Sequence, residues 1–379
     1  MNNRIKELIL PFLKPTILFE SVPDYADNTR AVYDEMVRRG LNRRYYLIWY
    51  NKDGQFTVLT KNGEYVLNGK RTIGARMKLL SILRKTRLSI LCNRFIEPIC
   101  PQQKVIFIAH GSPMKSVNGY YTLPDFVDRF FGQGPGFLNM IQRDMEVPKD
   151  KLQALGFPRN DVFSKPAIDS RKLFSTDCEK IVAWYPTYRQ HKNGFKTSCK
   201  NALPLLHDLE NAKKLNAIAK ELNTLLVLKP HYVQDTTDIK KENFSNIVLI
   251  DDTLFAKNGI SSYGFLAGCD ALVTDYSSVY YDFLLCNKPI GVVWEDIEEY
   301  RAFPGFAIDI DYVMKGAEKI YTVEDFRRFL QDLHSGVDRL QTERKEICAF
   351  ANYSDDGQNT KRVTDAIIRE LDCKSYSKA

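Results

Sequence analysis

Short β-type runs alternate with helical segments along most of the chain, and this alternation constrains the fold more than any other feature. In the first half, apolar runs predict strands at Thr16–Glu20, Tyr45–Trp49, Leu88–Cys92 and Lys104–Ala109. Helical spacing of apolar residues predicts helices at Asn28–Arg39, Thr72–Leu83 and Pro135–Arg143. Asn28 is the expected N-cap of the first helix and Gly40 its C-cap. Such an order is typical of parallel sheets covered by helices.

A second series of the same kind begins near Lys180. Its expected strands are Ile181–Trp184, Thr224–Leu228, Ile247–Ile250, Ala271–Thr274 and Pro289–Val293. The helices expected within it are Leu209–Glu221, Ser261–Ala267 and Ser277–Leu285. After Gly316 no further strong strand is expected, and the chain is predicted to be helical at Val323–Leu333, Leu340–Phe350 and Lys361–Leu371.

The two series predict two domains, because 379 residues exceed what one hydrophobic core comfortably holds. The polar, irregular stretch 158–180 separates them. We therefore expect domains at 1–170 and 171–355, followed by a helix within 356–379 that crosses back to the first. The predicted fold class is α/β of the GT-B type, with two Rossmann-like domains facing a central cleft. Ligands of such sheets bind at the carboxyl ends of the strands.

Composition favours a folded protein inside the cell. The hydrophobic share is 44%, and the eight cysteines include no CxxC pair and no zinc-type cluster. We expect these cysteines to be small core residues in a reducing compartment. The N-terminal apolar stretch is interrupted by Pro11, Lys14 and Pro15, which makes a poor signal peptide. No uninterrupted apolar run reaches the length that spans a bilayer.

The net charge of +7 is unevenly distributed. The segment 70–87 holds seven basic residues and no acidic one, interleaved with apolar residues at helical spacing. A basic amphipathic helix suits an anionic membrane surface. The alternative is a helix that packs its apolar side in the core and leaves its basic side solvated. No helix-turn-helix, RNP or zinc-finger pattern accompanies the charge, so no nucleic acid is expected as a partner.

Polar residues suited to phosphate chemistry directly follow four apolar strands. The first two of these four loops, in chain order, contain His110 and Thr187. His110 and Gly111 follow Val105–Ala109, where an imidazole can serve as a general base. A structural histidine bonded to the backbone is the alternative. Thr187 and Arg189 follow the strand at 181–184 and offer a hydroxyl and a planar guanidinium for phosphate oxygens. Such residues are also common in solvent-facing loops.

The other two loops lie in the second series as well. Lys229 and His231, on either side of a stiffening proline, form a plausible diphosphate clamp after the strand at 224–228. Asp275, Ser277 and Ser278 lie between a strand and a helix, where free backbone N–H groups and hydroxyls suit a phosphate. An ordinary strand-ending turn and an ordinary helix cap are the alternatives. Four such loops in order are harder to dismiss than one.

Here a family resemblance becomes specific. The run HGSPMK at 110–115 resembles the motif HGTPLK of the CDP-glycerol:poly(glycerophosphate) glycerophosphotransferases, which include teichoic acid primases and polymerases. LGFPRND at 155–161 is similar to the family's LGxPRND, and PTYR at 186–189 is similar to its APTWR. KPH at 229–231 is identical to the family's KPH. TDYSSVYYDF at 274–283 resembles TDYSSxxFDF and is followed by the family's KPI at 288–290. Ala109 stands where an aromatic residue is frequent, and Tyr232 where proline is frequent.

The resemblance implies roles for these residues. His110 would deprotonate an acceptor hydroxyl, and His231 with Arg189 would stabilise the CMP leaving group. The donor diphosphate would be held by Thr187, Arg189, Lys229, Ser277 and Ser278, with Asp275 ordering the loop or touching the alditol. Domain 1–170 would face the acceptor and the membrane, and domain 171–355 would bind the CDP-activated donor. Phosphoryl transfer of this kind depends on positioning and electrostatics, so neither a metal nor another cofactor is expected.

The implied function is transfer of an alditol phosphate, glycerol phosphate first, from CDP-glycerol or CDP-ribitol to a polyprenyl-linked acceptor. The product would be a teichoic-acid-like or capsular surface polymer, and the enzyme would sit peripherally on the inner face of the cell membrane. Docking is expected from Arg76, Lys78, Arg84 and Lys85. One alternative is a GT-B glycosyltransferase that uses a nucleotide sugar for surface polysaccharide. Another is a membrane-surface binding module without activity, against which the two histidines argue.

Overall fold

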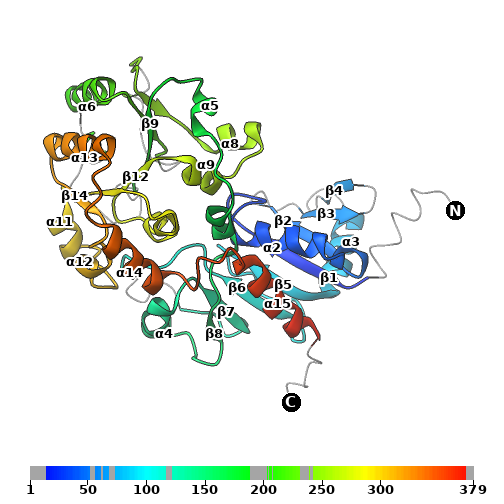
Figure 1. Ribbon diagram of the computed structural model, residues 1–379. Coiled ribbons are helices and arrows are strands. Elements are labelled where there is room, and N and C mark those ends of the chain that lie inside the picture. The colour runs from blue at the N-terminus through cyan, green and yellow to red at the C-terminus, as the bar shows by residue number, and fades with distance from the viewer. Residues whose placement is uncertain are drawn as a thin grey trace. The chain divides into compact units, whose positions relative to one another are not determined.

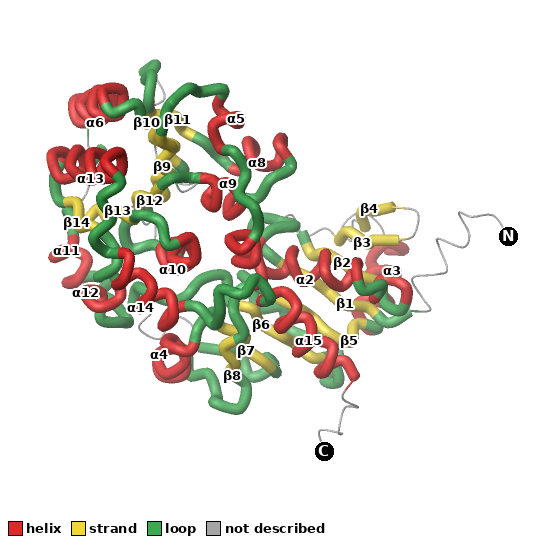
Figure 2. Tube along the Cα trace, in the orientation of Figure 1, coloured by secondary structure: helices red, strands yellow, loops and turns green. Residues whose placement is uncertain are grey.

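The structure is a computed structural model of the 379-residue chain. It describes residues 14–51, 56–60, 63–67, 73–116, 122–187, 203, 205, 206, 208–230, 239 and 242–372. The chain divides into two compact units (Figures 1 and 2). The first unit comprises 1–110, 122–161 and 353–379, and the second comprises 111–121 and 162–352. The chain therefore enters the second unit first at Gly111, directly after His110.

An eight-stranded sheet forms the centre of the first unit, in the order β4-β3-β2-β1-β5-β6-β7-β8. Its strands are β1 (Thr16–Glu20), β2 (Tyr46–Tyr50), β3 (Phe56–Thr60), β4 (Gly63–Leu67), β5 (Thr86–Leu91), β6 (Lys104–Ile108), β7 (Arg129–Gly132) and β8 (Leu152–Ala154). The strands from β2 to β8 in this order pair in parallel, whereas β3 and β4 add an antiparallel hairpin at one edge. That hairpin was not predicted from the sequence.

Helices cover this sheet. They are α2 (Asp27–Arg38), α3 (Ile73–Arg84), α4 (Leu138–Asp144) and α15 (Asn359–Asp372), with 3₁₀ turns at η2 (Leu41–Arg43), η3 (Pro135–Phe137) and η4 (Pro158–Ser164). The C-terminal α15 lies beside α2 (Figure 1) and places Val363 and Ile367 in the same core as Phe19 and Trp49. The rings of Phe19 and Trp49 stack 5.7 Å apart. Burial of an aromatic side chain contributes about 2–3 kcal/mol, so this cluster anchors both helices on the sheet.

The prediction that Asn28 is the N-cap of its helix is wrong. The helix α2 begins one residue earlier, at Asp27, and its N-cap position is Ala26 without a side-chain hydrogen bond. Asn28 lies in the first turn and is fully buried, and its side-chain amide donates to the carbonyl oxygen of Ala109 at 2.8 Å. A tertiary hydrogen bond has therefore taken the place of the local cap.

A six-stranded parallel sheet forms the centre of the second unit, in the order β11-β10-β9-β12-β13-β14. Its strands are β9 (Lys180–Tyr185), β10 (Thr224–Leu228), β11 (Ile247–Leu249), β12 (Ala271–Thr274), β13 (Ile290–Val293) and β14 (Glu318–Ile320). In chain order this is 3-2-1-4-5-6, the order of the Rossmann fold. The order reverses between β9 and β12, and ligands of such sheets bind outside the carboxyl ends of the strands at that point.

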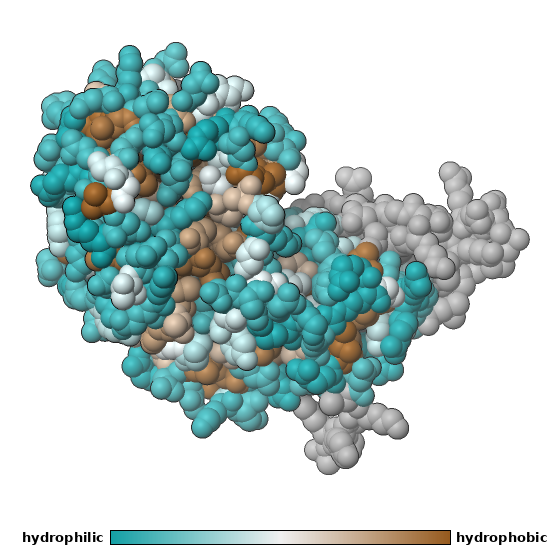
Figure 3. Space-filling model, viewed as in Figure 1, coloured by the Kyte–Doolittle hydropathy of each residue, from teal (hydrophilic) through white to brown (hydrophobic). Residues whose placement is uncertain are grey.

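The helices of the second unit have clear local signals. They are α5 (Ser170–Phe174), α6 (Leu209–Glu221), α8 (Asp252–Asn258), α9 (Ser262–Gly268), α10 (Val279–Phe283), α11 (Ile297–Ala302), α12 (Ile310–Val313), α13 (Val323–Ser335) and α14 (Gln341–Ala351), with η5 at Leu284–Cys286. Thr322 and Asp325 form a capping box at the start of α13, and Gly336 ends it in the left-handed conformation. Figure 3 shows a mostly hydrophilic surface over α6 and α13, whose apolar residues face the core.

Two further expectations need correction. The chain was expected to form no strong strand after Gly316, but β14 pairs in parallel with β13 there. Its three residues contain a single buried apolar side chain, Ile320, so no periodic pattern could reveal it. The helix expected at 277–285 is the short α10 followed by the 3₁₀ turn η5. Within the described ranges, no helix is long and apolar enough to cross a bilayer.

Candidate functional site

The loops that follow β9 and β12 meet at the point where the strand order of the second sheet reverses. Asp275, directly after β12, is 1% exposed. Its carboxylate accepts hydrogen bonds from the backbone N–H of Thr187, at 2.9 Å to each oxygen, and from the Thr187 hydroxyl at 2.5 Å. One residue earlier, the Thr274 hydroxyl donates to the Tyr185 carbonyl oxygen at 2.7 Å. These bonds join the loop after β9, where the motif PTYR begins, to the loop after β12, which carries TDYSSVYYDF.

Of the two roles expected for Asp275, these bonds show that it orders the loop, and contact with the alditol stays a prediction. Both of its oxygens are engaged by Thr187, so the carboxylate orders the loop after β9. The hydroxyl hydrogen of Thr187 also points to Asp275. We call these three hydrogen bonds the Asp275–Thr187 lock. The two residues together fix the backbone at Thr187, the last residue of the described range after β9. Arg189 itself lies outside the described residues, as does His231, and their roles stay predictions.

Lys229 follows β10 on the same edge of the sheet. Its backbone N–H donates to the Trp184 carbonyl oxygen at 2.9 Å, which continues the pairing with β9. Its ammonium group lies 3.1 Å from Asp252, at the start of α8, and 5.7 Å from the centre of the Tyr185 ring. Asp252 is 58% exposed, so this pair is readily opened. Sequence reasoning missed this pairing with Asp252.

Ser278 occupies the N-cap position of α10, and Ser277 precedes it. Both serines are partly exposed, and neither hydroxyl forms a hydrogen bond with another described residue. The helix has only five residues before it tightens into η5, so its dipole adds little. The two hydroxyls remain available to an anion.

Gly111, from the motif HGSPMK, lies close to Ser278, from the motif TDYSSVYYDF, within the second unit. A Cβ atom at position 111 would lie 2.6 Å from Ser278 Oγ, a distance that real contacts do not show. A side chain at position 111 would therefore displace the Ser278 hydroxyl. The next residues are fixed on the segment after α11, where Ser116 N–H donates to the Gly305 carbonyl oxygen and Ala307 N–H to that of Met114, each at 3.0 Å.

His110 directly precedes this glycine and follows β6 in the first unit. Its side chain is exposed, as a residue that meets a substrate must be. The sequence motif therefore places an accessible imidazole one residue before the glycine that lies against Ser278. Among the described residues, no three His, Cys, Asp or Glu side chains gather where they could hold a metal ion.

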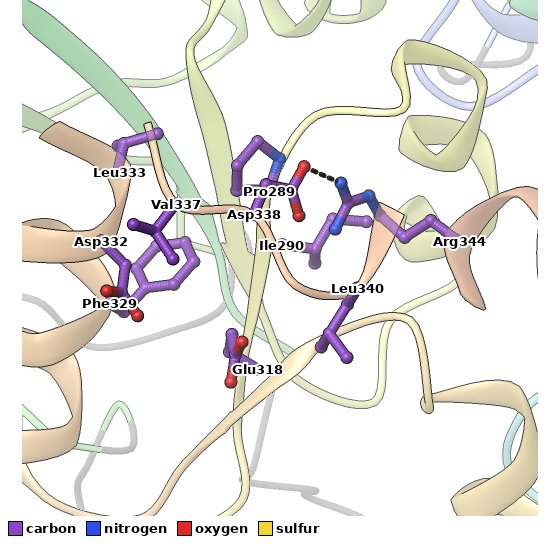
Figure 4. Close-up of a pocket in the computed structure, with 10 residues that line it drawn as sticks. All are labelled: Pro289, Ile290, Glu318, Phe329, Asp332, Leu333, Val337, Asp338, Leu340 and Arg344. Atoms are coloured by element: carbon purple, nitrogen blue, oxygen red, sulfur yellow. Dashed lines mark hydrogen bonds and ion pairs between the residues drawn. The ribbon is translucent and has the colours of Figure 1, made fainter. Parts of the chain in front are cut away.

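A small cavity lies at the other edge of the second sheet. Its volume is only about 10 Å³, and Figure 4 shows Pro289, Glu318, Phe329 and the ion pair between the buried Arg344 and Asp338 around it. Pro289 directly precedes β13, and Glu318 begins β14. Because ligands bind at the carboxyl ends of such strands, this cavity belongs to the packing between the sheet and its helices.

The expected docking segment is only partly described. Arg76 and Lys78 lie in α3, but their side chains are outside the described part. Arg84 is exposed and Lys85 partly exposed. The last turn of α3 packs on the sheet through Ile82, which is 1% exposed and touches Leu18 and Ile48, whereas Met77 is 64% exposed. The helix thus combines a packed end with an exposed apolar residue.

Comparison with known proteins agrees with the motifs. The family model of CDP-glycerol:poly(glycerophosphate) glycerophosphotransferase matches residues 4–369. The chain is 28% identical to a teichoic acid poly(glycerol phosphate) polymerase of Bacillus spizizenii over 95% of this chain and 93% of that protein. It is 25% identical to the polymerase of the same description from Staphylococcus epidermidis, over 95% of this chain but only about half (51%) of that protein.

A solved structure shares the fold. The wall teichoic acid polymerase TagF matches with a TM-score of 0.70 at 18% identity, over 97% of this chain and 93% of that one. This similarity and the two sheets confirm the predicted α/β fold class of the GT-B type. Together with the match of the family model over 4–369, it leads to one conclusion: the chain belongs to the CDP-glycerol:poly(glycerophosphate) glycerophosphotransferase family.

Proposed function

We propose that this chain transfers an alditol phosphate, glycerol phosphate first, from its CDP-activated form to a lipid-linked acceptor and releases CMP. The observation that carries the proposal is the carboxyl edge of the second sheet. There the Asp275–Thr187 lock, Lys229 and the Ser277–Ser278 hydroxyls converge at the reversal of a Rossmann strand order. Family membership supplies the identity of the donor.

In the proposed reaction, the acceptor hydroxyl attacks the phosphorus that carries the glycerol. The bond between this phosphorus and the bridging oxygen breaks, and CMP leaves with that oxygen. His110 takes the proton of the attacking hydroxyl. His231 and Arg189 stabilise the charge on the leaving phosphate, while Lys229, Ser277 and Ser278 hold the diphosphate and Thr187 with Asp275 holds the loop.

The acceptor is proposed to be polyprenyl-linked, and the polymer to be of the teichoic acid or capsular type. Its reactive end then lies near an anionic bilayer, where the enzyme docks peripherally from the cytoplasmic side. The basic residues of α3 and the exposed Met77 support docking by this helix. The second unit is proposed to bind the donor and the first to face the acceptor.

The released nucleotide tests the proposal. The protein is incubated with CDP-glycerol or CDP-ribitol and a lipid-linked acceptor analogue, and the nucleotide products are separated. We expect CMP and an acceptor that has gained one or more alditol phosphate units. A glycosyltransferase, the second candidate, would instead release a nucleoside diphosphate from a nucleotide sugar. Release of CDP, or the absence of turnover with both CDP-alditols, would contradict the proposal.

A further inference from the structure

The motif LGFPRND at 155–161 has no part in the donor site, yet it contacts the backbone of His110. The Arg159 side chain is only 5% exposed. Its Nη1 donates to Asp27 Oδ1 at 2.7 Å and also to the carbonyl oxygen of His110. We propose that Arg159, together with Asn28, is a positioning residue that sets the direction of the His110 imidazole. All of these residues belong to the first unit.

Asn28 holds the chain on the other side of His110. It is fully buried and uses both ends of its amide. The Nδ2 group donates to the Ala109 carbonyl oxygen at 2.8 Å, and Oδ1 accepts from the backbone N–H of Arg159 at 3.2 Å. The N–H of Ala109 donates to the Phe131 carbonyl oxygen at 3.1 Å. The carbonyl groups before and after the Cα atom of His110 are therefore both fixed by side chains.

The imidazole itself has no comparable support. In many enzymes a carboxylate accepts a hydrogen bond from the catalytic imidazole and orients it. Here the His110 ring forms no hydrogen bond with another residue of the described ranges. The direction of its Cα–Cβ bond consequently depends on the two peptide groups that Asn28 and Arg159 hold.

The motif that carries Arg159 is itself anchored on the C-terminal helix. Asp161 accepts hydrogen bonds from the backbone N–H groups of Asn359 and Thr360, at 2.8 Å each, and so caps α15. Gly156 has a φ of +81°, and Asn359 lies against it so closely that no Cβ atom fits. The Arg159 guanidinium lies 4.9 Å from the centre of the Phe157 ring, which further fixes its plane.

The main test compares Arg159→Met with Arg39→Met. The first change keeps a long apolar stem but removes the hydrogen bonds to His110 and Asp27. Arg39 also joins α2 to α15, through Asp365 at 2.5 Å, but does not contact residues 109 and 110, so its replacement is a matched control for lost stability. Each protein is loaded with [¹³Cε1]-histidine, and the His110 signal among the five histidines is identified with His110→Ala.

We expect Arg159→Met to shift the His110 signal and to lower kcat about 10- to 100-fold, because a small misplacement of a reacting group costs about that much. Affinity for CDP-glycerol should stay within about twofold, since Arg159 lies in the first unit. Arg39→Met should change neither. Arg159→Lys, which keeps the positive charge and an N–H donor, should restore part of the turnover. If Arg159→Met does not fold, Asn28→Ala removes the other half of the support and should act in the same way.

The expected effect on kcat rests on the proposed function of His110 as the base. The expected shift of the His110 ¹³Cε1 signal is independent of that function. An unshifted His110 signal in Arg159→Met overturns the positioning role, whatever the turnover. A shifted signal with wild-type turnover would support positioning but refute His110 as the base. A loss of kcat no larger than that of Arg39→Met, with an unshifted signal, would mean that Arg159 only stabilises the fold.

Discussion

The lock between Asp275 and Thr187 should couple the stability of the second unit to its affinity for the donor. A hydrogen bond to a buried charged group contributes about 1.5–3 kcal/mol. Asp275→Asn keeps the shape of the side chain but turns an amide N–H₂ towards one of the Thr187 donors, which bond at 2.9, 2.9 and 2.5 Å in the native protein. Because the buried carboxylate also loses a desolvation cost, we expect a net destabilisation of about 2 kcal/mol.

A double-mutant cycle isolates the pair. Thr187→Val removes the hydroxyl and should cost about 1 kcal/mol alone. The double variant should cost about 2 rather than 3 kcal/mol, because the same interaction is lost only once. Unfolding is followed by tryptophan fluorescence in a Trp49→Phe background, so that Trp184 and Trp294 report on the second unit.

The affinity for CDP-glycerol then tests whether the lock also contributes to donor binding. Each lock variant should bind CDP-glycerol at least about tenfold more weakly in calorimetry, because the loop that leads to Arg189 is released. Thr274→Val is the matched control, since it removes a buried hydroxyl bond of 2.7 Å one residue away and leaves the lock intact. Additive costs in the cycle would refute the coupling. An unchanged donor affinity in Asp275→Asn would show that the loop is not part of the donor site.

Three further predictions address the remaining groups. His110→Ala should abolish turnover and leave CDP-glycerol affinity near the wild-type value in calorimetry; an equal loss of affinity would assign His110 to the donor site. His231→Ala and Arg189→Ala should weaken both turnover and nucleotide binding, with or without EDTA, and activity within about threefold of wild type would remove either residue from the site. Replacing the docking residues with Gln should lower sedimentation with anionic vesicles by two or more orders of magnitude, at about 1 kcal/mol per charge, and spare activity on a short water-soluble acceptor. These residues are Arg76, Lys78, Arg84 and Lys85. Undiminished vesicle binding would show that these residues form a solvent-exposed side of the helix without a role in docking. The matched control replaces four exposed basic residues of the second unit: Lys172, Lys213, Lys214 and Arg328.

Elements with a continuous apolar run and clear borders were predictable to the residue. The strands Thr16–Glu20, Thr224–Leu228 and Ala271–Thr274 are almost entirely buried, and the helix Leu209–Glu221 begins after an Asp208 cap. Strands of three residues such as β14 carry too little pattern. Their pairing depends on a neighbour that is distant in the chain, so propensity alone does not reveal them.

For the candidate site, the sequence indicated the types of residue but not which of them pair. Loops after apolar strands indicated Thr187 and Asp275 separately. Their lock joins residues 88 positions apart and follows only from the strand order, which places β9 beside β12. Asn28 shows the same limit, since a local rule made it a cap while a contact with Ala109, 81 positions away, decided its actual role.

The reversal points of the two sheets support the proposed assignment of the donor to the second unit. In the first sheet the parallel order reverses between β1 and β5, and the fully buried Glu20 at the end of β1 fills that place. Its carboxylate accepts from the backbone N–H groups of Cys92, Asn93 and Arg94 at 3.0 to 3.2 Å, and from Arg94 Nε at 2.9 Å. An internal anion thus occupies the backbone N–H groups that would otherwise attract a phosphate. In the second sheet, Asp275 accepts hydrogen bonds from Thr187, while the Ser277 and Ser278 hydroxyls form no hydrogen bond with another described residue. A diphosphate at the first reversal point would have to compete with Glu20 for these N–H groups, which supports the proposal that the donor binds at the second. Glu20→Gln should therefore loosen the first unit without creating a second nucleotide site, and calorimetry with CDP-glycerol should still give one site per chain.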